Sequence, residues 1–392
     1  MTDDTNDPVG RTEPGSPMEP ETGPEPEIGG PEPVEPPPQE SDPEASVAAD
    51  ALIVSDATSA AALVVEDEDR GRRRKLVLLL LLSLAVVGLL LFSLWYLLFR
   101  QPITTLPLPG IAQPDLPHYV YSIYGVEAPI GVAVNPSGER IYVTETGAER
   151  LVHVYDGKGT QLGTFEPPKT TRETRVPVYI AIDPLTEDVY VSDRSSAAIF
   201  VYDRDGQFRR RFEPTPALEP FAPLGLAFDP QGNLYVTDVG GPAHRIVEFD
   251  RAGQVVRRIG TPGQFSFPNG LALDKAGNLV VADSNNGRIC VLDKDGRQIS
   301  AIARGVASGE LGLPRGTAVD ANDRLYVSDS TGQALRVYSL DQLSARPKYF
   351  GAVGTEGIGD GQFQYPNGVA TDARARVYIA DWANDRVQVW SY

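Results

Sequence analysis

Between residues 118 and 392 the hydrophobic residues fall into short alternating runs, separated by clusters of Asp, Asn, Lys and Gly. The stretch 270–303 shows the pattern, with apolar runs at residues 270–274, 279–283, 288–292 and 297–303. Alternation with a period of two, bounded by turn residues, predicts β-strands, and helical periodicity is absent. The sequence therefore predicts four antiparallel strands in each unit of about 45 residues, which is typical of a propeller blade.

This unit recurs six times. Five copies open with Pro-x-Gly, and the second copy has Tyr179 in place of the glycine. The glycines are Gly131, Gly225, Gly270, Gly316 and Gly368. An acidic residue closes the second predicted strand of each copy: Glu145, Asp193, Asp238, Asp283, Asp329 and Asp381, at spacings of 48, 45, 45, 46 and 52. Two independent markers with one period predict an all-β, six-bladed β-propeller of four-stranded antiparallel blades over residues 118–392.

The two ends of the repeat region predict how the ring closes. The last copy stops after its third strand, at residues 386–390, and the chain ends at Tyr392. The segment 119–124, which precedes the first copy, reads as a fourth strand without a blade of its own. We expect this segment to pair with the last blade, because that pairing removes the open edges of the sheet.

A different pattern precedes the repeat, because residues 76–99 carry no charge over 24 positions. As a helix this run would be ~36 Å long, more than the ~30 Å hydrocarbon core of a bilayer. Its N-terminal flank is basic (Arg70, Arg72, Arg73, Arg74 and Lys75), and Trp95 and Tyr96 lie at the other end. The positive-inside rule predicts one transmembrane helix within residues 70–100, a cytoplasmic N-terminus and an extracytoplasmic, extracellular propeller: a single-pass, type II protein of the cell membrane.

The charge of the chain lies almost entirely in its first segment. The formal net charge is −18, and residues 1–69 hold 19 acidic residues against one basic residue. The remaining 34 acidic and 34 basic side chains cancel. The Pro- and Glu-rich segment 1–69 is predicted to be a disordered cytoplasmic tail, acting either as a solvated spacer or as the docking site of a cytoplasmic partner. The Pro-rich segment 101–117 is predicted to be an extended spacer.

Two copies carry a recognisable signature. Residues 268–274 read Pro-Asn-Gly-Leu-Ala-Leu-Asp, and residues 278–283 read Asn-Leu-Val-Val-Ala-Asp. Residues 366–370 and 378–381 follow the same pattern. These segments resemble the NHL-repeat family, and the resemblance extends over residues 118–392, although Glu145 and Tyr179 depart from it. The resemblance implies a ring that serves as a binding platform, while a minority of related six-bladed rings are enzymes.

Two sets of side chains recur at fixed places and are predicted to be structural. The carboxylates of Asp193, Asp238, Asp283, Asp329 and Asp381 are expected to accept backbone N–H groups in Asx-type turns. The second set, Arg245, Arg288 and Arg386, is expected to bridge neighbouring blades. The single cysteine, Cys290, is assigned the strand register of Glu248 and Gln388 and is expected to be half-exposed. One thiol cannot form an intramolecular disulfide.

Departures from the repeat indicate where binding takes place. In a propeller, the loops entering the inner strands and the loops between second and third strands share one face, which we call the loop face. Its variable positions are Arg194, Asn269, Asn285, Arg315, Asn367 and Trp382. Loops on a rigid scaffold commonly carry binding sites, and an exposed Trp beside Arg and Asn is typical of a binding hot spot. Ordinary surface variation is the alternative interpretation.

The remaining chemistry assigns no catalytic residue and no metal ligand. The three histidines, His118, His153 and His244, occupy non-equivalent positions, so no zinc site is predicted. A neutral ring outside the cytoplasm argues against nucleic acid as a partner. The first hypothesis is a membrane-anchored binding or protein-interaction platform for a protein, glycan or small molecule, without a cofactor. The alternative is a membrane-tethered, metal-dependent hydrolase or lyase similar to lactonases, with a divalent cation such as calcium in the central channel.

Overall fold

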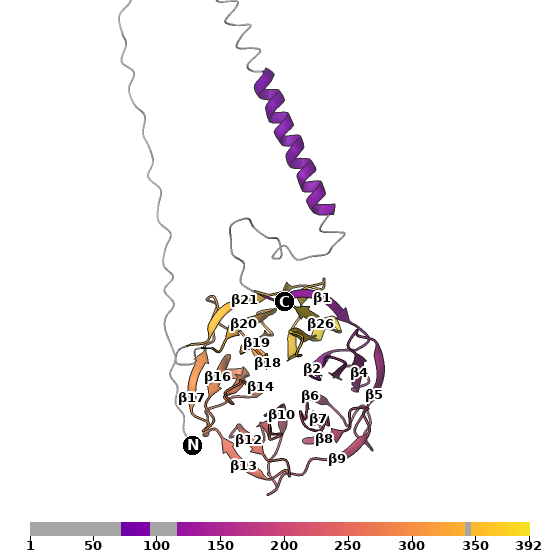
Figure 1. Ribbon diagram of the computed structural model, residues 1–392, viewed down its shortest axis with the longest axis vertical. Coiled ribbons are helices and arrows are strands. Elements are labelled where there is room, and N and C mark those ends of the chain that lie inside the picture. Colours follow the sequence, from indigo (N-terminus) through magenta and orange to yellow (C-terminus); the bar gives the residue numbers. More distant parts are fainter. Residues whose placement is uncertain (1–71, 95–115, 342–345) are drawn as a thin grey trace, which may run out of the picture. The chain divides into compact units, whose positions relative to one another are not determined.

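The computed structural model describes residues 72–94, 116–341 and 346–392. The predicted tail 1–69, most of the spacer 101–117 and residues 95–99 lie outside the described residues. One helix, Arg72–Leu94, covers 23 residues and is long and apolar enough to cross a membrane by length and composition (Figure 1). Leu and Val fill this segment, and its one glycine, Gly88, meets no neighbouring atom that would exclude a side chain.

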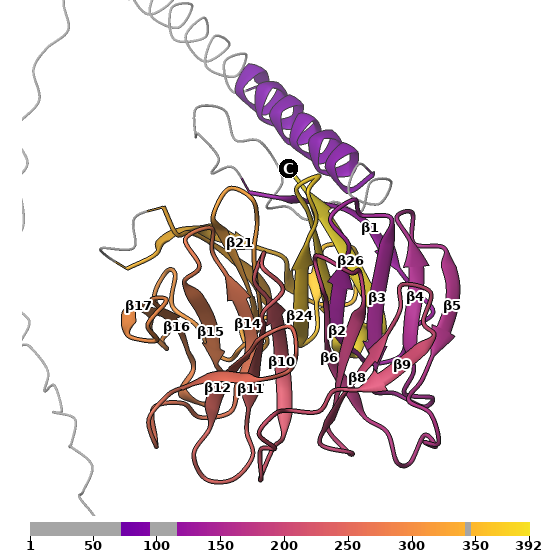
Figure 2. The same ribbon diagram turned by 60° about the horizontal axis from the view of Figure 1, so that its bottom comes forward.

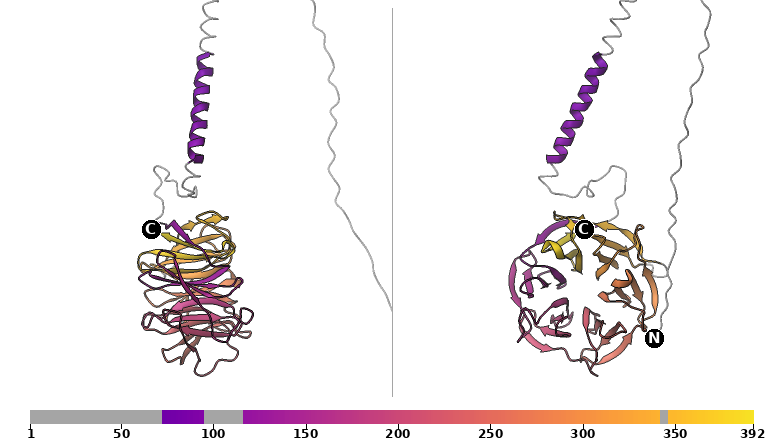
Figure 3. Two further views of the ribbon diagram at one scale, coloured as in Figure 1. Left: turned by 90° about the vertical axis from the view of Figure 1, so that its right-hand side faces the viewer. Right: turned by 180° about the vertical axis from the view of Figure 1, so that it is seen from behind.

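The C-terminal region is a six-bladed β-propeller of four-stranded antiparallel sheets, as predicted (Figures 1 and 3). Blade 1 contains β2 (Pro129–Val134), β3 (Arg140–Glu145), β4 (Val152–Asp156) and β5 (Gln161–Phe165). Blade 2 contains β6 (Pro177–Ile182), β7 (Val189–Asp193), β8 (Ala198–Tyr202) and β9 (Phe208–Arg211). Blade 3 contains β10 (Pro223–Phe228), β11 (Leu234–Asp238), β12 (Arg245–Phe249) and β13 (Val255–Ile259).

The second half of the ring repeats this plan. Blade 4 contains β14 (Pro268–Leu273), β15 (Leu279–Asp283), β16 (Arg288–Leu292) and β17 (Gln298–Ile302). Blade 5 contains β18 (Pro314–Val319), β19 (Arg324–Asp329), β20 (Ala334–Ser339) and β21 (Lys348–Val353). Blade 6 contains β24 (Pro366–Thr371), β25 (Arg376–Asp381), β26 (Arg386–Ser391) and β1 (His118–Ile123). The short parallel pair β22 (Thr355–Glu356) and β23 (Gln362–Phe363) precedes blade 6, and the 3-10 helices η3 (Ser284–Asn286) and η4 (Trp382–Asn384) follow β15 and β25.

The ring closes through the strand that the sequence left without a blade. β1 pairs antiparallel with β26, and Ile123 lies opposite Val387. Figure 1 shows this closure where the purple β1 lies beside the yellow C-terminal strands. The predicted strand 119–124 is therefore confirmed, displaced by one residue. The first and last strands of the propeller share one sheet, so unravelling either end breaks the same blade.

The hydrophobic core lies between the blades. Ile289 and Val291 of β16, for example, pack in one buried cluster with Leu325 and Val327 of β19 in the next blade. The tilted view in Figure 2 shows the blades standing side by side around the channel. A middle strand is therefore covered on both faces, which removes the usual exposure of every second residue.

This packing corrects the prediction for Cys290. The cysteine is fully buried, and burial raises the pKa of its thiol to about 11. It lies opposite Val281 on β15, in the register of Gln388 and not of Glu248, and both of those side chains are also buried. The prediction failed because alternation along a strand was taken to mean alternation between core and solvent, whereas both faces of this strand meet neighbouring blades.

Candidate functional site

The channel mouth on the loop face is built from the second residue of every inner strand. This residue is the variable position of Pro-x-Gly in each blade: Ile130, Val178, Leu224, Asn269, Arg315 and Asn367. In all six blades the ladder between the first and second strands shifts register across this segment. Such an irregularity re-aims a side chain. All six side chains line a single cavity of about 470 Å³, which we call the mouth cavity.

The glycines that follow these residues allow the inner strands to approach one another closely. A Cβ atom at Gly225 would collide with the carbonyl oxygen of Asn269 on the next inner strand, and one at Gly270 with that of Arg315. Blade 2 is the exception, because Tyr179 occupies this position and its ring lines both the mouth cavity and a smaller cavity deeper in the channel. Tyr179 therefore forms part of the floor of the mouth cavity.

The mouth cavity has two chemically different halves. Blades 1, 2 and 3 contribute Ile130, Val178 and Leu224, and the last two are buried in one hydrophobic cluster with Tyr179. Blades 4, 5 and 6 contribute only polar side chains at the equivalent position: Asn269, Arg315 and Asn367. At this position one side of the mouth is thus apolar and the other can donate hydrogen bonds, although Arg194 of blade 2 also lines the cavity on the first side.

The rim of the mouth cavity carries exposed aromatic side chains. Tyr365 is 48% exposed and Trp382 is 38% exposed, and their rings meet edge to face at 6.2 Å between centroids. Phe267 lines the cavity two blades away, at the position equivalent to Tyr365. Large, partly exposed aromatic rings beside a cavity contribute strongly to binding when a partner covers them.

The backbone holds two of these aromatic residues in a costly conformation. Phe267 and Tyr365 both have φ of 53°, in the left-handed region that bulky residues rarely adopt. Each is held by a side chain from the preceding blade: the Phe267 N–H donates to His244 Nδ1 at 2.9 Å, and the Tyr365 N–H donates to Gln333 Oε1 at 2.7 Å. Strained residues fixed in this way cluster at functional sites.

The charges of the mouth cavity are positive. In the part of the chain that the structure describes, no Asp or Glu lines it, whereas Arg315 and Arg194 do. Within residues 116–341 and 346–392, neither guanidinium makes an ion pair or a hydrogen bond. Burial raises the pKa of the Tyr179 phenol, against the opposing effect of Arg315. The phenol therefore stays neutral and leaves the charge of Arg315 uncompensated.

The two asparagines of the polar half differ in how far they are satisfied. Asn269 is buried, and its amide Nδ2 donates to Ser284 Oγ at 2.7 Å and to the Phe267 carbonyl at 3.2 Å. Asn367 is half-buried, and its side chain makes no hydrogen bond within the described part of the chain. Asn367 thus offers both an amide donor and an amide acceptor beside Arg315.

The structure brings together five of the six side chains predicted for the loop face. Arg194, Asn269, Arg315, Asn367 and Trp382 all line the mouth cavity. Asn285 does not line it: this residue lies exposed in η3, and its backbone N–H donates to the Ser266 carbonyl at 3.0 Å.

Sequence reasoning missed the apolar half of the mouth, namely Ile130, Val178 and Leu224. Only polar or aromatic departures from the repeat were taken as candidate binding residues, and a hydrophobic residue in a strand was assigned to the core. The signal was nevertheless present, because these three residues occupy the same Pro-x-Gly position as the three polar ones.

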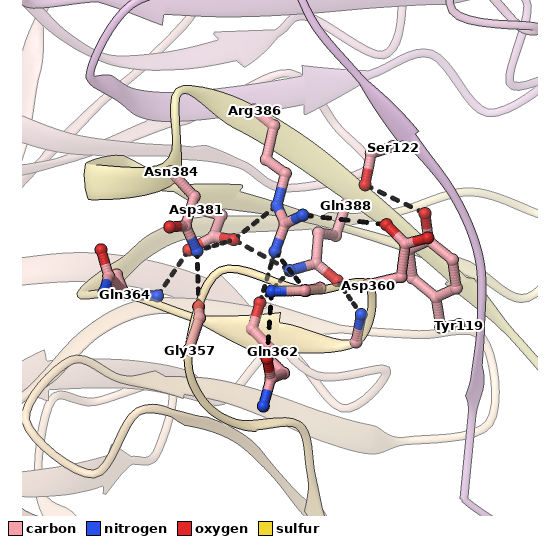
Figure 4. Close-up of polar contacts among 12 residues, drawn as sticks. Tyr119, Ser122, Gly357, Asp360, Gln362, Gln364, Asp381, Asn384, Arg386 and Gln388 are labelled. Atoms are coloured by element: carbon pink, nitrogen blue, oxygen red, sulfur yellow. Dashed lines mark hydrogen bonds and ion pairs between the residues drawn. The ribbon is translucent and has the colours of Figure 1, made fainter. Parts of the chain in front are cut away.

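The recurring Asp carboxylates lie outside the mouth cavity and accept hydrogen bonds from loops of the protein itself. In blade 6 the buried Asp381 accepts hydrogen bonds from the Gln364 N–H at 2.7 Å and from Asn384 and Arg386 Nε at 2.8 Å each (Figure 4). Asp283 of blade 4 likewise accepts from the Ser266 N–H at 2.7 Å. Each carboxylate fastens the loop that enters its blade.

The recurring arginines do not bridge neighbouring blades in the way that the sequence suggested. Arg386 pairs with Asp381 of its own blade and donates through Nη2 to the carbonyls of Gly359 and Gln362, at 2.7 Å each. Arg288 makes the equivalent bond to the Gln264 carbonyl at 2.7 Å, and Arg245 bonds the Pro220 carbonyl at 3.4 Å. These carbonyls belong to the connecting segments that arrive from the preceding blade, so the arginines clamp connectors and not neighbouring strands.

Blade 1 replaces the Asp–Arg pair with Glu145 and His153. Glu145 Oε2 lies 2.7 Å from His153 Nε2, and both side chains are buried. His118 lies in β1, and His244 supports Phe267, so the three histidines occupy separate places. Within residues 72–94, 116–341 and 346–392, no group of three or more His, Cys, Asp or Glu side chains is arranged to hold a metal ion.

Comparison with known sequences identifies the repeat. The NHL repeat matches residues 265–292, which form most of blade 4. NHL repeat-containing protein 3 of Mus musculus is 27% identical over 216 residues, covering 54% of this chain and 50% of that protein. Protein brain tumor of Drosophila melanogaster is 24% identical over 159 residues, covering 40% of this chain and 15% of that protein. The chain thus spans about half the length, or less, of these curated relatives.

Among solved structures, one described as a streptogramin B lyase is similar to this chain with a TM-score of 0.51. The match covers 71% of this chain and 99% of that one, at 14% sequence identity. At this identity the similarity concerns the fold alone. Comparison and geometry together describe a six-bladed propeller that carries an NHL repeat.

Proposed function

We propose that this chain is a single-pass membrane protein whose propeller acts outside the cytoplasm as a binding platform, with the mouth cavity as its contact site. One observation carries the proposal. The loop face combines an uncompensated guanidinium, Arg315, with the exposed aromatic rings of Tyr365 and Trp382 around a single cavity. Unsatisfied polar groups beside exposed aromatic rings form the composition of a binding hot spot.

The membrane part of the proposal is supported by the helix Arg72–Leu94 and by the basic residues at its start. The positive-inside rule places such residues in the cytoplasm and the propeller on the other side. A protease added to intact cells should therefore cut between residues 101 and 117 and release an intact propeller. Protection of the propeller, together with cleavage of the tail 1–69, would show the reverse orientation.

The platform is tested by asking whether capture of a partner depends on the mouth cavity. The full-length chain, tagged at its N-terminus, is cross-linked to bound partners on intact cells, and the captured material is quantified. Trp382→Ala should lower capture by tenfold or more, since a buried hot-spot aromatic contributes about 2 kcal/mol or more to binding.

Asn285→Ala is the matched control, because Asn285 shares the loop face but lies outside the mouth cavity. Capture by this variant should equal that of the unmodified chain. Equal capture by Trp382→Ala and Asn285→Ala would remove the mouth cavity from the proposal.

A further inference from the structure

The mouth cavity is asymmetric in a way that specifies the chemistry of a ligand. We propose that it binds a small amphiphilic anion, with the anionic group on the half formed by blades 4, 5 and 6 and the apolar body on the half formed by blades 1, 2 and 3. This inference rests on the binding role proposed above and assigns a ligand class to it.

Arg315 is the centre of the polar half. It is half-buried and has no ion-pair partner among the described residues, whereas Arg336 and Arg386 in blades 5 and 6 each pair with a buried carboxylate, at 2.7 Å and 2.8 Å. Removing a guanidinium from water without a counter-ion is unfavourable, and an entering carboxylate would supply that counter-ion. The planar guanidinium can donate two parallel hydrogen bonds to one carboxylate.

Two further side chains of the mouth cavity favour the same ligand. Asn367 lies in the adjacent blade with an unused amide group, and Arg194, which follows β7 of blade 2 on the other half of the mouth, adds a second positive charge at the rim. Among the described residues no Asp or Glu lines the mouth cavity, so no carboxylate of theirs competes for these donors. A cation would meet two guanidinium groups and no carboxylate, so the mouth cavity selects against it.

The opposite half has no donor to offer from its inner strands. Ile130, Val178 and Leu224 present aliphatic side chains, and the neighbouring Val176 is apolar as well. An ion with a full hydration shell gains nothing from these aliphatic side chains. An apolar group attached to the anion would displace water from it, at roughly 25 cal/mol for each Å² buried.

The size of the mouth cavity sets the scale of the ligand. Its volume of about 470 Å³ lies within the range of roughly 300–1,000 Å³ that is usual for small-molecule sites. A single ring system or a short chain with one acidic group fits this space. A folded protein could touch only the rim, at Tyr365 and Trp382.

The experiment uses the full-length chain in nanodiscs of neutral lipid and three water-soluble probes of one shape. These are 2-naphthoate, its neutral analogue 2-naphthamide and the cation 2-naphthylmethylammonium. Dissociation constants are measured by titration calorimetry, with empty nanodiscs as the reference for partition into lipid. We expect 2-naphthoate to bind about tenfold more tightly than the amide, since a charged hydrogen bond contributes about 1.5–3 kcal/mol. The cation should bind most weakly.

Single substitutions test which half of the mouth cavity contacts the anionic group and which contacts the apolar body. Arg315→Gln should weaken 2-naphthoate by about tenfold and leave 2-naphthamide unchanged, because only the anion uses the guanidinium. Leu224→Asn should weaken both probes alike. Arg258→Gln is the matched control, because Arg258 is an exposed arginine of the outer strand β13 and should leave all three probes unchanged. Equal melting temperatures of the variants establish that each remains folded.

Three results would overturn the inference. They are equal affinity for the three probes, an unchanged affinity for 2-naphthoate in Arg315→Gln, and absence of 2-naphthoate binding. If the anion fails to bind while Trp382→Ala still abolishes capture of a cellular partner, the ligand class is wrong and the platform remains. If both tests fail, the mouth cavity is not a binding site.

Discussion

The two mouths of the channel differ in how their charges are used. The opposite mouth opens into a larger cavity of about 630 Å³, lined by the carboxylates of Asp229, Asp274 and Asp320. All three carboxylates cap turns between the first and second strands, and each accepts at least two hydrogen bonds. Its one basic residue, Lys275, is exposed to water. Within the described residues the smaller mouth on the loop face holds unpaired donors. These unsatisfied polar groups, and not the volume of the cavity, are the reason to propose it as the binding site.

The largest expected difference between the mouths is in stability. Asp320 bonds Tyr326 Oη at 2.9 Å, pairs with Arg324 Nε at 3.0 Å and accepts two backbone N–H groups of its turn. Asp320→Ala removes the carboxylate and should lower the free energy of unfolding by about 3 kcal/mol. Denaturant unfolding measures this change. In the control Asp295→Ala, whose side chain is 57% exposed, the change should be below about 0.5 kcal/mol.

A second difference, in access to solvent, lies between the two channel mouths and the packed interfaces between blades, where Cys290 is buried. Burial raises the pKa of the Cys290 thiol to about 11, so at pH 8 the folded protein holds about 100-fold less thiolate than an ordinary cysteine with a pKa of 9. Iodoacetamide should therefore alkylate Cys290 slowly in the native state and rapidly in urea, as followed by mass spectrometry. Fast alkylation of Cys290 in the native state would mean that the interface between blades is as accessible to the reagent as the channel mouths.

The same shift predicts a direction for stability at high pH. Above about pH 9 the thiol of the unfolded chain ionises while the folded chain keeps its proton, so ionisation of Cys290 lowers stability between about pH 9 and pH 11. Cys290→Ser, compared with the unmodified chain across this range, isolates the contribution. If the pH dependence of stability is the same in Cys290→Ser as in the unmodified chain, ionisation of Cys290 does not contribute to it.

The smallest effect is expected at the loop-face mouth itself. Arg315 makes no bond within the described residues, so Arg315→Gln should change the free energy of unfolding by less than about 0.5 kcal/mol. Thermal unfolding beside Asp320→Ala measures the contrast. A loss as large as that of Asp320→Ala would show that Arg315 is structural and that the two mouths do not differ in kind.

The fold was largely readable from the sequence, because the markers of a blade are local and periodic. Pro-x-Gly and the acidic residue of the second strand identify six copies, and the unpaired segment 119–124 predicts the closure that β1 makes with β26. The Cys290 prediction failed because burial in a propeller depends on the neighbouring blade, which lies in a distant part of the sequence.

The site was readable only in part. Arg315, Asn367 and Trp382 stand out as polar or aromatic departures in loops and strand starts, and all three line the mouth cavity. Leu224 does not stand out, because an apolar residue in a strand is expected in the core. Asn285 stands out equally well by its chemistry but lies outside the cavity, because it is the second residue of η3, whereas Trp382 is the first residue of the equivalent η4.

By itself, then, the sequence determined the blade count, the strand that closes the ring and the apolar segment before it, since each depends on periodicity or composition along the chain. The tertiary structure decided which side chains meet. The ring brings positions about 45 residues apart in the sequence close to one axis. Each inner strand starts with a register shift, and the second residue of each strand lines the common cavity. In that cavity the apolar residues of blades 1, 2 and 3, such as Leu224, face the polar residues of blades 4, 5 and 6, such as Arg315. The two sets form the two halves of the proposed site.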